Sequence, residues 1–421
     1  MLDRPVIESL LDIDFYKLSM GQMIFRRHPT VQVTLGFINR TKSVQLAKVV
    51  DIGQLREELE ECRRLGFYPS DLHYIMGTYE YDRPMFKLDY IKFLQKLKLP
   101  EFRLEEKDGQ FDLEFKGDWA TVTYWETLAL SIVNELYYRN LMGPLNSRFD
   151  DEMMGAEGRI RLGKKIRELK KHPEITFSDF GTRRRFSRKW QDYVVGVLVE
   201  ELPEQFRGTS NVYLAKKYSE ITKREVVPTG TNAHELPMVY SGIFWYKDNQ
   251  DPTYSQVQVL KDWEREYGLD LSIFLPDTFG SDWFFKNAVN CTRLKLWKGS
   301  RHDSGPPLEY AMKRIREYYY AGINPQEKLI IFADGLNVET MREISENLDG
   351  KIRYTFGWGT DLTNDLGPAP LSIVVKAVMA DGRHVAKLSD NIAKATGHPG
   401  AVERMKSLVG YTNTYAAACK S

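Results

Sequence analysis

The feature that most constrains the fold is a series of short apolar runs after Gly158, each followed by a polar cluster rich in glycine or aspartate. The runs occupy residues 175–177, 226–228, 271–275, 294–297, 329–332 and 352–356. Stretches with helical spacing lie between the runs, at residues 185–198, 251–267, 308–321 and 338–346. Because strands that alternate with helices usually pair in one direction, this part of the chain predicts a parallel sheet.

The position of the polar clusters favours one parallel architecture over another. A closed α/β barrel gathers all its strand ends at one mouth, whereas an open doubly wound sheet concentrates its site at one switch point. Since a cluster follows nearly every predicted strand, we expect an α/β barrel over residues 146–380. The open sheet is the alternative.

The first part of the chain has a different pattern and predicts a separate α+β domain over residues 1–145. Helical spacing runs through residues 10–25, and apolar residues alternate at 31–35 and 111–115, as in half-buried antiparallel strands. We expect the last segment, residues 381–421, to pack back on the first two domains.

Composition excludes several classes of protein. The 421 residues include 42% apolar residues, enough for a large core, and 59 basic residues balance 58 acidic ones to a net charge of +1. This balance argues against a nucleic-acid or anionic-membrane binder. Cys62, Cys291 and Cys419 are too far apart for a disulfide framework or zinc site. With no signal peptide or membrane span expected, the sequence predicts a cytoplasmic protein.

Two clusters suit phosphate groups. In the cluster 357–360, glycines allow main-chain N–H groups to approach a phosphate and Thr360 adds a hydroxyl, although a tight turn is the alternative. In the cluster 179–185, Arg183, Arg184 and Arg185 follow a predicted strand. Their bidentate guanidinium groups suit a polyanion, and ordinary surface arginines are the alternative.

Two further clusters contain histidine beside acid. His234 precedes Glu235 at the expected start of a helix and is a candidate nucleophile, with an ordinary core or surface histidine as the alternative. His302, beside Asp303, is the competing candidate. In the same cluster Arg301 offers a cation for a carboxylate or phosphate. Further acids at the rim are Asp179, Asp277 and Asp334. Together with the arginines they suit Mg²⁺ bound to phosphate and ribose. A lattice of solvated surface ion pairs is the alternative.

Together these clusters resemble the bacterial-type nicotinate phosphoribosyltransferases, which belong to the type II phosphoribosyltransferases. The matching segments run in order along the chain at residues 10–18, 179–187, 208–211, 230–235, 301–305 and 385–390. The resemblance therefore covers nearly the whole sequence. It implies an irregular α/β barrel with an N-terminal α+β domain.

The resemblance also implies a reaction and a set of roles. Nicotinate and 5-phosphoribosyl diphosphate would give nicotinate mononucleotide and diphosphate, the first step of NAD salvage from nicotinate. ATP hydrolysis through a phosphohistidine at His234 would be coupled to it, with Mg²⁺ as cofactor. The implied catalytic residues are His234, Glu235 and Asp303. The implied nicotinate-binding residues are Tyr16, Phe180, Thr231 and Arg301. The implied phosphoribosyl diphosphate-binding residues are Arg183, Asp334, Gly335, Gly357, Gly359 and Thr360.

Some questions stay open at this stage. Pro306 stands where the family usually has an acidic residue, so metal use could differ, and no metal ligand is assigned. The same fold acting on nicotinamide or quinolinate is one alternative, and a non-catalytic sugar-phosphate-binding barrel is another. Tyr16 lies so far from the barrel in sequence that the partner subunit of a homodimer could supply it.

Overall fold

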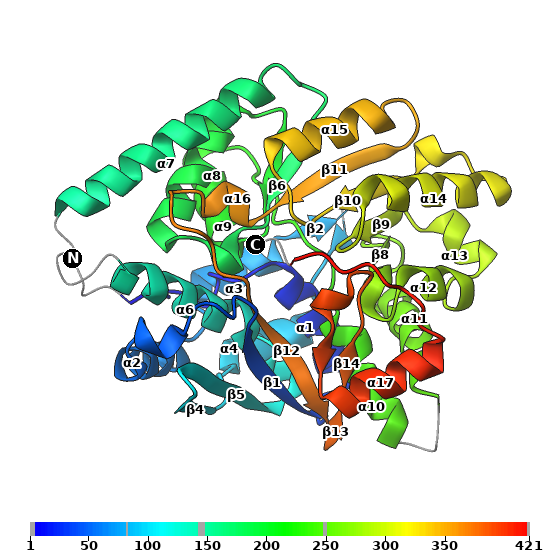
Figure 1. The fold of residues 1–421 in the computed structure, drawn as a ribbon, viewed down its shortest axis with the longest axis horizontal. Coiled ribbons are helices and arrows are strands. Elements are labelled where there is room, and N and C mark those ends of the chain that lie inside the picture. Colours follow the sequence, from blue (N-terminus) through cyan, green and yellow to red (C-terminus); the bar gives the residue numbers. More distant parts are fainter. Residues whose placement is uncertain (1–4, 81–82, 142–147, 247–250, 419–421) are drawn as a thin grey trace.

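The computed structural model describes residues 5–80, 83–141, 148–246 and 251–418. A parallel sheet with its helices and an antiparallel sheet lie next to each other, and one apolar core runs through both (Figure 1). None of the described helices is both long and apolar enough to cross a bilayer.

The parallel sheet has six strands in the order β7-β6-β11-β10-β9-β8. These strands are β7 (Phe206–Thr209), β6 (Phe177–Asp179), β11 (Arg353–Trp358), β10 (Leu329–Phe332), β9 (Gly299–His302) and β8 (Ile273–Phe274). Every pairing between them is parallel. The carboxyl ends of all six strands therefore lie at the same edge of the sheet.

The four predicted helices are confirmed, with shifted ends. They are α8 (Arg188–Glu201), α11 (Ser255–Tyr267), α14 (Pro307–Tyr320) and α15 (Val338–Leu348). Side-chain caps set two of these starts: the Ser187 hydroxyl accepts a hydrogen bond from the N–H of Trp190, and Asn337 accepts one from Thr340. Each cap satisfies a main-chain donor that the first helical turn leaves free.

Two predicted strands were wrong. Residues 294–297 end the helix α13 (Cys291–Leu296), which the Asn290 side chain caps, and the strand begins only at Gly299. Glycine is required there, because an added Cβ would lie 1.8 Å from the carbonyl oxygen of Leu329. Residues 226–228 make only one bridge, from Pro228 to Thr209, since proline has no N–H to donate to a ladder.

The predicted α/β barrel fold class is confirmed, but the hydrogen-bonded ladder of its described strands is not continuous around the barrel. Beyond β7, the segment 227–229 runs alongside Thr209: the Thr209 N–H donates to Val227 at 3.2 Å and the Thr229 N–H donates to Thr209 at 2.9 Å. Among the described strands no ladder joins β7 to β8. The result is an α/β sheet of barrel type that hydrogen bonds do not close.

The antiparallel sheet confirms the α+β character of the N-terminal part. Its strands, in spatial order, are β13 (Arg383–His384), β12 (Ile373–Ala380), β1 (Gln32–Asn39), β5 (Gln110–Asp118) and β4 (Phe102–Lys107). On β5, Phe111, Leu113 and Phe115 face the core while their neighbours do not. β12, drawn in orange beside the blue β1, returns from the far end of the chain to pair with β1 (Figure 1).

Helices and short turns complete the fold. Those that matter for the site are α1 (Tyr16–Arg27), α5 (Trp119–Val122), α6 (Trp125–Leu141), α10 (Glu235–Tyr246), α16 (Thr360–Thr363), α17 (Pro399–Val409) and the 3₁₀ turns η2 (Thr182–Arg184) and η4 (Pro276–Thr278). The remaining helices are α2 (Ile52–Arg64), α3 (Pro69–Met76), α4 (Leu88–Lys96), α7 (Arg148–Leu169), α9 (Val212–Thr222) and α12 (Ser281–Asn287). In the C-terminal segment, Met405 and Val409 of α17 pack against Phe279 and Leu388. The predicted domain limits themselves stay a prediction.

Candidate active site

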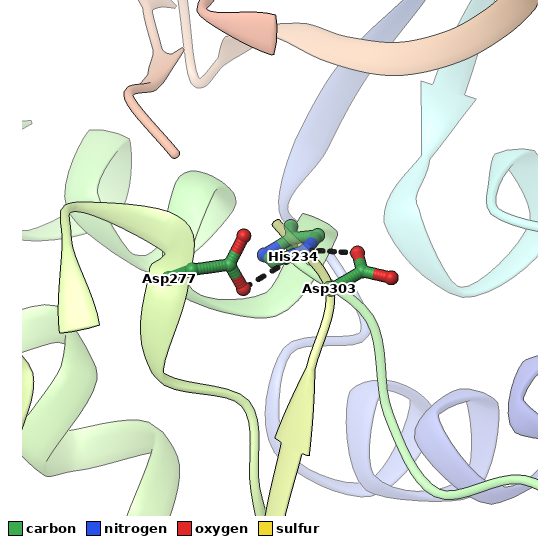
Figure 2. A group of neighbouring side chains, drawn as sticks. All are labelled: His234, Asp277 and Asp303. Atoms are coloured by element: carbon green, nitrogen blue, oxygen red, sulfur yellow. Dashed lines mark hydrogen bonds and ion pairs between the residues drawn. The ribbon is translucent and has the colours of Figure 1, made fainter. Parts of the chain in front are cut away.

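Three polar side chains converge beyond the carboxyl ends of the parallel strands. His234 immediately precedes α10, Asp277 lies in η4 after β8, and Asp303 follows β9. The imidazole lies between the two carboxylates, with Nε2 2.8 Å from Asp303 Oδ2 and 3.6 Å from Asp277 Oδ1 (Figure 2). Two clusters that are about seventy residues apart in sequence thus meet at one point.

His234 is held as an uncharged base. Its side chain is buried, and burial together with the positive charge of Lys387 lowers its pKa to about 4, although Asp277 and Asp303 act in the opposite direction. Its second ring nitrogen, Nδ1, lies 2.9 Å from the Thr278 hydroxyl. A neutral imidazole retains a lone pair at pH 7, which a nucleophile or base needs.

Asp277 and Lys387 form a buried ion pair behind the histidine. Lys387, on the short strand β14 (Ala386–Lys387), places its Nζ 3.3 Å from Asp277 Oδ2, which also accepts the Ser304 hydroxyl at 2.7 Å. Burial raises the pKa of Asp277, but Lys387 and His234 lower it to about 2. Within the described structure the other oxygen, Oδ1, is buried without a hydrogen-bond partner. The sequence placed Asp277 among the acids at the rim, but it gave Lys387 no role, although Lys387 lies in one of the matched segments.

Arg301 and His302 are neighbours in sequence but differ in their contacts. Arg301 Nη1 donates to the carbonyl of Asn232 at 3.1 Å, and its buried Nε has no partner in the described part of the chain. His302, the competing candidate, is buried against Phe332, and its Nε2 lies 3.0 Å from the Gly305 carbonyl. His302 is therefore a core residue, and Arg301 keeps donor capacity for a ligand.

Tyr16 and Arg183 come together from opposite parts of the chain. The Tyr16 hydroxyl donates to Glu126 at 3.2 Å, and the Arg183 guanidinium lies 5.8 Å from the centre of the Tyr16 ring. Arg183 also pairs with Asp14 at 3.3 Å. At Gly230 an added Cβ would lie 3.0 Å from the main-chain nitrogen of Tyr16, so glycine lets the loop before His234 approach the main chain at the start of α1.

Glu235 is engaged with the N-terminal part of the chain. One carboxylate oxygen accepts from Lys17 Nζ at 2.7 Å and the other from Trp119 Nε1 at 2.7 Å. Lys17 is fully buried and also pairs with Glu126 at 2.7 Å. Glu235 thus ties the start of α10 to α1 and α5. A catalytic role for it stays a prediction.

The remaining predicted residues lie around this centre. The Phe180 ring covers Gly357, where an added Cβ would be 2.4 Å from the ring. The main-chain N–H of Phe180 donates to the Trp358 carbonyl at 2.8 Å. Gly359 lies close to the Phe180 carbonyl, and Thr360 begins α16. The glycine at 357 therefore has a packing reason as well as the predicted one.

A lysine that the sequence did not single out joins two strand ends. Lys394 forms an ion pair with Asp334 after β10 and donates to the main-chain carbonyl of Asp303 after β9 at 3.0 Å. Gly335 takes a positive φ of 58° in the same turn. Thr231 is half-buried, and its carbonyl accepts the Ser19 hydroxyl.

The arginine triplet does not act as a unit. Arg185 is fully buried and binds both oxygens of Asp12, at 2.6 and 2.7 Å, while Arg184 Nε donates to the carbonyl of Ile373 at 3.2 Å. Arg184 and Arg185 thus have structural partners, and the assignment of Arg183 to substrate phosphates stays a prediction. Arg183 alone lies with the Tyr16 group.

Comparison with known proteins identifies the family of this chain. Residues 175–413 match the nicotinate phosphoribosyltransferase family, and residues 11–134 match the N-terminal domain of that family. The chain belongs to the nicotinate phosphoribosyltransferase family. A crystal structure of nicotinate phosphoribosyltransferase from Porphyromonas gingivalis is 30% identical and superposes with a TM-score of 0.81, over 96% of this chain and 100% of that one. The enzyme from Vibrio cholerae is 29% identical, with a TM-score of 0.85 over 97% and 95% of the two chains.

The family resemblance implies Mg²⁺, and the residues present fit it. His234, Asp277 and Asp303 each offer one ligand atom, and these atoms lie within 4.8 Å of one another. The free Oδ1 of Asp277 and the carboxylate of Asp303 are hard oxygen donors of the kind that Mg²⁺ takes together with substrate phosphates.

Proposed function

We propose that this protein is a nicotinate phosphoribosyltransferase that forms nicotinate mononucleotide and diphosphate, with ATP hydrolysis coupled through a phosphate on His234. The observation that carries the proposal is the neutral, buried imidazole between Asp277 and Asp303, close to a guanidinium with an unused donor. Family membership supports the substrate class, and the site geometry supports the histidine.

The base would bind between aromatic rings beside a cation. Arg301 would pair with the nicotinate carboxylate, and its unpartnered Nε gives it a donor for this. Tyr16 and Phe180 would enclose the pyridine ring, with Thr231 at its edge. Fixed partners hold both rings, Glu126 for the Tyr16 hydroxyl and Gly357 below Phe180, so little order would be lost on binding.

The sugar and its phosphates would bind at the neighbouring strand ends. Asp303 would accept ribose hydroxyls, while Arg183, Gly359 and Thr360 would face phosphate oxygens. Breaking the bond between C1 and diphosphate develops positive charge on the ribose and negative charge on the leaving group. Mg²⁺ held by Asp277 and Asp303 would neutralise the diphosphate.

The coupled step uses the lone pair of His234. The imidazole nitrogen would attack the terminal phosphorus of ATP, the bond to the bridging oxygen would break, and ADP would leave with that electron pair. Attack by water on the phosphohistidine would then release inorganic phosphate. The added phosphate brings about two negative charges to the mouth of the site, where Lys387 and Lys394 lie close by.

Labelling tests the coupling directly. Incubation with ATP labelled in its terminal phosphate is expected to give an acid-labile label on the wild-type chain and none on His234→Ala. A wild type that takes no label would favour a sugar-phosphate-binding protein without the coupled step.

Base competition tests the acceptor. Nicotinate, nicotinamide and quinolinate are offered together with 5-phosphoribosyl diphosphate, and nicotinate is expected to be consumed first. Nicotinamide lacks the carboxylate that would pair with Arg301, and the second carboxylate of quinolinate would call for additional basic residues around the ring. Preference for nicotinamide or quinolinate would overturn the assignment of the base.

A further inference from the structure

Ser389 is a buried residue whose main chain is strained, next to the candidate active site. Its φ is 73°, and in the described part of the chain it is the only buried residue other than glycine with a positive φ. The other such residues lie in hairpin turns or at a helix end, where this conformation is common: Asp108, Lys223 and Asp381. A side chain costs free energy in this conformation, so neighbouring contacts must hold Ser389 there.

Side chains from residues 411–417, which we call the strap, hold the main chain at this point. The Tyr411 hydroxyl donates to the carbonyl of Ser389 at 2.6 Å, and Asn413 Nδ2 donates to the carbonyl of Asp390 at 2.7 Å. Both hydrogen bonds end on main-chain carbonyls. They therefore fix the direction of two successive peptide groups rather than that of a side chain.

The end of the strap pairs with the next two residues of the loop. The N–H of Ile392 donates to the carbonyl of Tyr415 at 3.0 Å, and the Asn391 side chain exchanges two hydrogen bonds with the main chain of Ala417, at 2.9 and 3.2 Å. The strap, drawn in red, runs from α17 to the middle of the molecule (Figure 1). None of its side chains is buried, so it contributes hydrogen bonds more than apolar packing.

The loop 389–394 continues from the strained residue to two strand ends of the site. Its last residue, Lys394, ends the 3₁₀ turn η6 (Ile392–Lys394). Lys394 Nζ donates to the main-chain carbonyl of Asp303 after β9 at 3.0 Å and forms an ion pair with Asp334 after β10. The position of this ammonium group therefore depends on the direction that the chain takes at the start of the loop.

We propose that the strap is a positioning element that holds Ser389 in its left-handed conformation and so keeps Lys394 at the ends of β9 and β10. Without the strap, Ser389 relaxes to a negative φ and the loop turns Lys394 away from Asp334. These strand ends carry residues predicted to bind the ribose and its phosphates, so the strap sets the affinity for 5-phosphoribosyl diphosphate and not that for nicotinate. The substrate part of this inference rests on the proposed function, whereas the loop part does not.

The variants are made in the full chain. The strap variant, Tyr411→Phe/Asn413→Ala, removes both hydrogen bonds to the loop carbonyls. Tyr218→Phe is its control, because the hydroxyl of the half-buried Tyr218 also donates to a main-chain carbonyl, that of Asp192, at 2.8 Å. Ser389→Gly and Ser389→Ala form a second matched pair. Both remove the serine hydroxyl, but only glycine takes a positive φ without steric cost.

Amide hydrogen exchange of the loop 389–394 tests the loop without any substrate. We expect exchange to be about tenfold faster or more in the strap variant than in the wild type and in Tyr218→Phe, because the loop opens locally. Adding Ser389→Gly to the strap variant should restore most of the protection, whereas adding Ser389→Ala should not. Wild-type exchange in the strap variant, or equal protection with glycine and with alanine, would overturn the inference.

Steady-state kinetics tests the consequence for the substrates. In the strap variant the KM for 5-phosphoribosyl diphosphate is expected to rise about ten- to hundredfold, with the KM for nicotinate and the urea midpoint close to those of the wild type. Ser389→Gly should again restore most of the loss. Faster loop exchange with an unchanged KM for 5-phosphoribosyl diphosphate, in an active wild type, would overturn the substrate part. A wild type that forms no nicotinate mononucleotide would count against the proposed function alone, since the exchange result stands without it.

Discussion

Two buried groups of charges lie close together in this molecule and differ in how completely they are paired. The three N–H donors of Lys17 are all engaged, by Glu126 and Glu235 at 2.7 Å each and by the Thr123 hydroxyl at 3.1 Å. Around His234, in contrast, one oxygen of Asp277 and the Nε of Arg301 are buried without partners in the described structure. The first group is complete without a ligand, and the second is not.

The difference separates stability from binding. A buried polar group without a hydrogen-bond partner lowers the stability of the fold. Such groups are found at functional sites, where a bound ligand supplies the missing partner. The Lys17 group, which consists of Lys17, Trp119, Thr123, Glu126 and Glu235, joins α1, α5, α6 and α10. The three N–H donors of Lys17 are all engaged without a ligand. We therefore expect changes in the Lys17 group to appear first in the free energy of unfolding, and changes around His234 to appear first in substrate binding and catalysis.

The largest effect is expected from Lys17→Met. It leaves Glu126 and Glu235 buried without their shared cation, which should lower the free energy of unfolding by roughly 3–5 kcal/mol. Urea denaturation measures the loss. Lys313→Met is the control, because its ion pair with Asp282 is largely exposed and should contribute less than about 1 kcal/mol. Equal losses in the two variants would mean that the Lys17 group is not a structural tie.

Arg301→Ala should show the opposite pattern. Its denaturation midpoint is expected to stay close to that of the wild type, while nicotinate binding weakens by roughly 2–5 kcal/mol because a desolvated charge pair is lost. Calorimetric titration with nicotinate and with nicotinamide gives the two affinities. Nicotinamide should be affected far less, and an unchanged nicotinate affinity would place the carboxylate elsewhere.

Acid should distinguish the two groups by their pH ranges. His234 has a pKa of about 4 in the folded state against 6.5 when exposed, so the unfolded chain takes up the proton first as the pH falls. Stability should therefore decrease from pH 6.5 to about 4, by roughly 3 kcal/mol for this residue. Lys17, Lys376 and Arg183 hold the pKa of Glu126 far below 4.5 against the effect of burial, so its contribution is lost only below that pH.

The control for this pH dependence is His234→Gln. The pKa of His302 is also lowered by burial, so some slope should remain in the variant, and the difference between the two chains measures His234 alone. Unfolding curves with the same slope between pH 6.5 and 4.5 would show that His234 is not held neutral.

The smallest effect is expected from Gly357→Ala, which lies in neither charged group. The new Cβ would be 2.4 Å from the ring of half-buried Phe180, so the ring must move, at a cost of roughly 1–3 kcal/mol. A higher KM for nicotinate is the expected readout. In the double variant Gly357→Ala/Phe180→Leu the smaller side chain should relieve the clash, so Gly357→Ala should then cost little free energy of unfolding. If the losses of the two single variants simply add in the double variant, the proposed contact between residues 357 and 180 is contradicted.

Much of this arrangement could be predicted from local patterns in the sequence. Parallel strands bring their carboxyl ends to one edge, so the clusters that hold Asp277 and Asp303, after β8 and β9, could be expected to meet. The motif match gave Tyr16 a place near the base, and the structure brings it beside Arg183. The prediction worked for these strand ends, and His234 joins them although the run before it makes only one bridge, to Thr209.

The rest depended on contacts that no local pattern specifies. The apolar run 294–297 fits a last helical turn as well as a strand, and only the cap at Asn290 and the close approach at Gly299 distinguish them. The motif match implied a catalytic role for Glu235, but no local pattern showed that Lys17, more than two hundred residues away in sequence, binds its carboxylate. The sequence likewise did not predict that Lys387 pairs with Asp277.

The course of β12 has a consequence for how the chain is made. Strand β1 lies between β5 and β12, and its partner across Phe37 is Val375, which leaves the ribosome more than three hundred residues later. Until then one edge of β1 has bare main-chain N–H and C=O groups, a surface on which foreign strands can add. Nascent chains and N-terminal fragments should therefore depend on chaperones, and splitting this protein at its apparent domain limit should yield an insoluble first half.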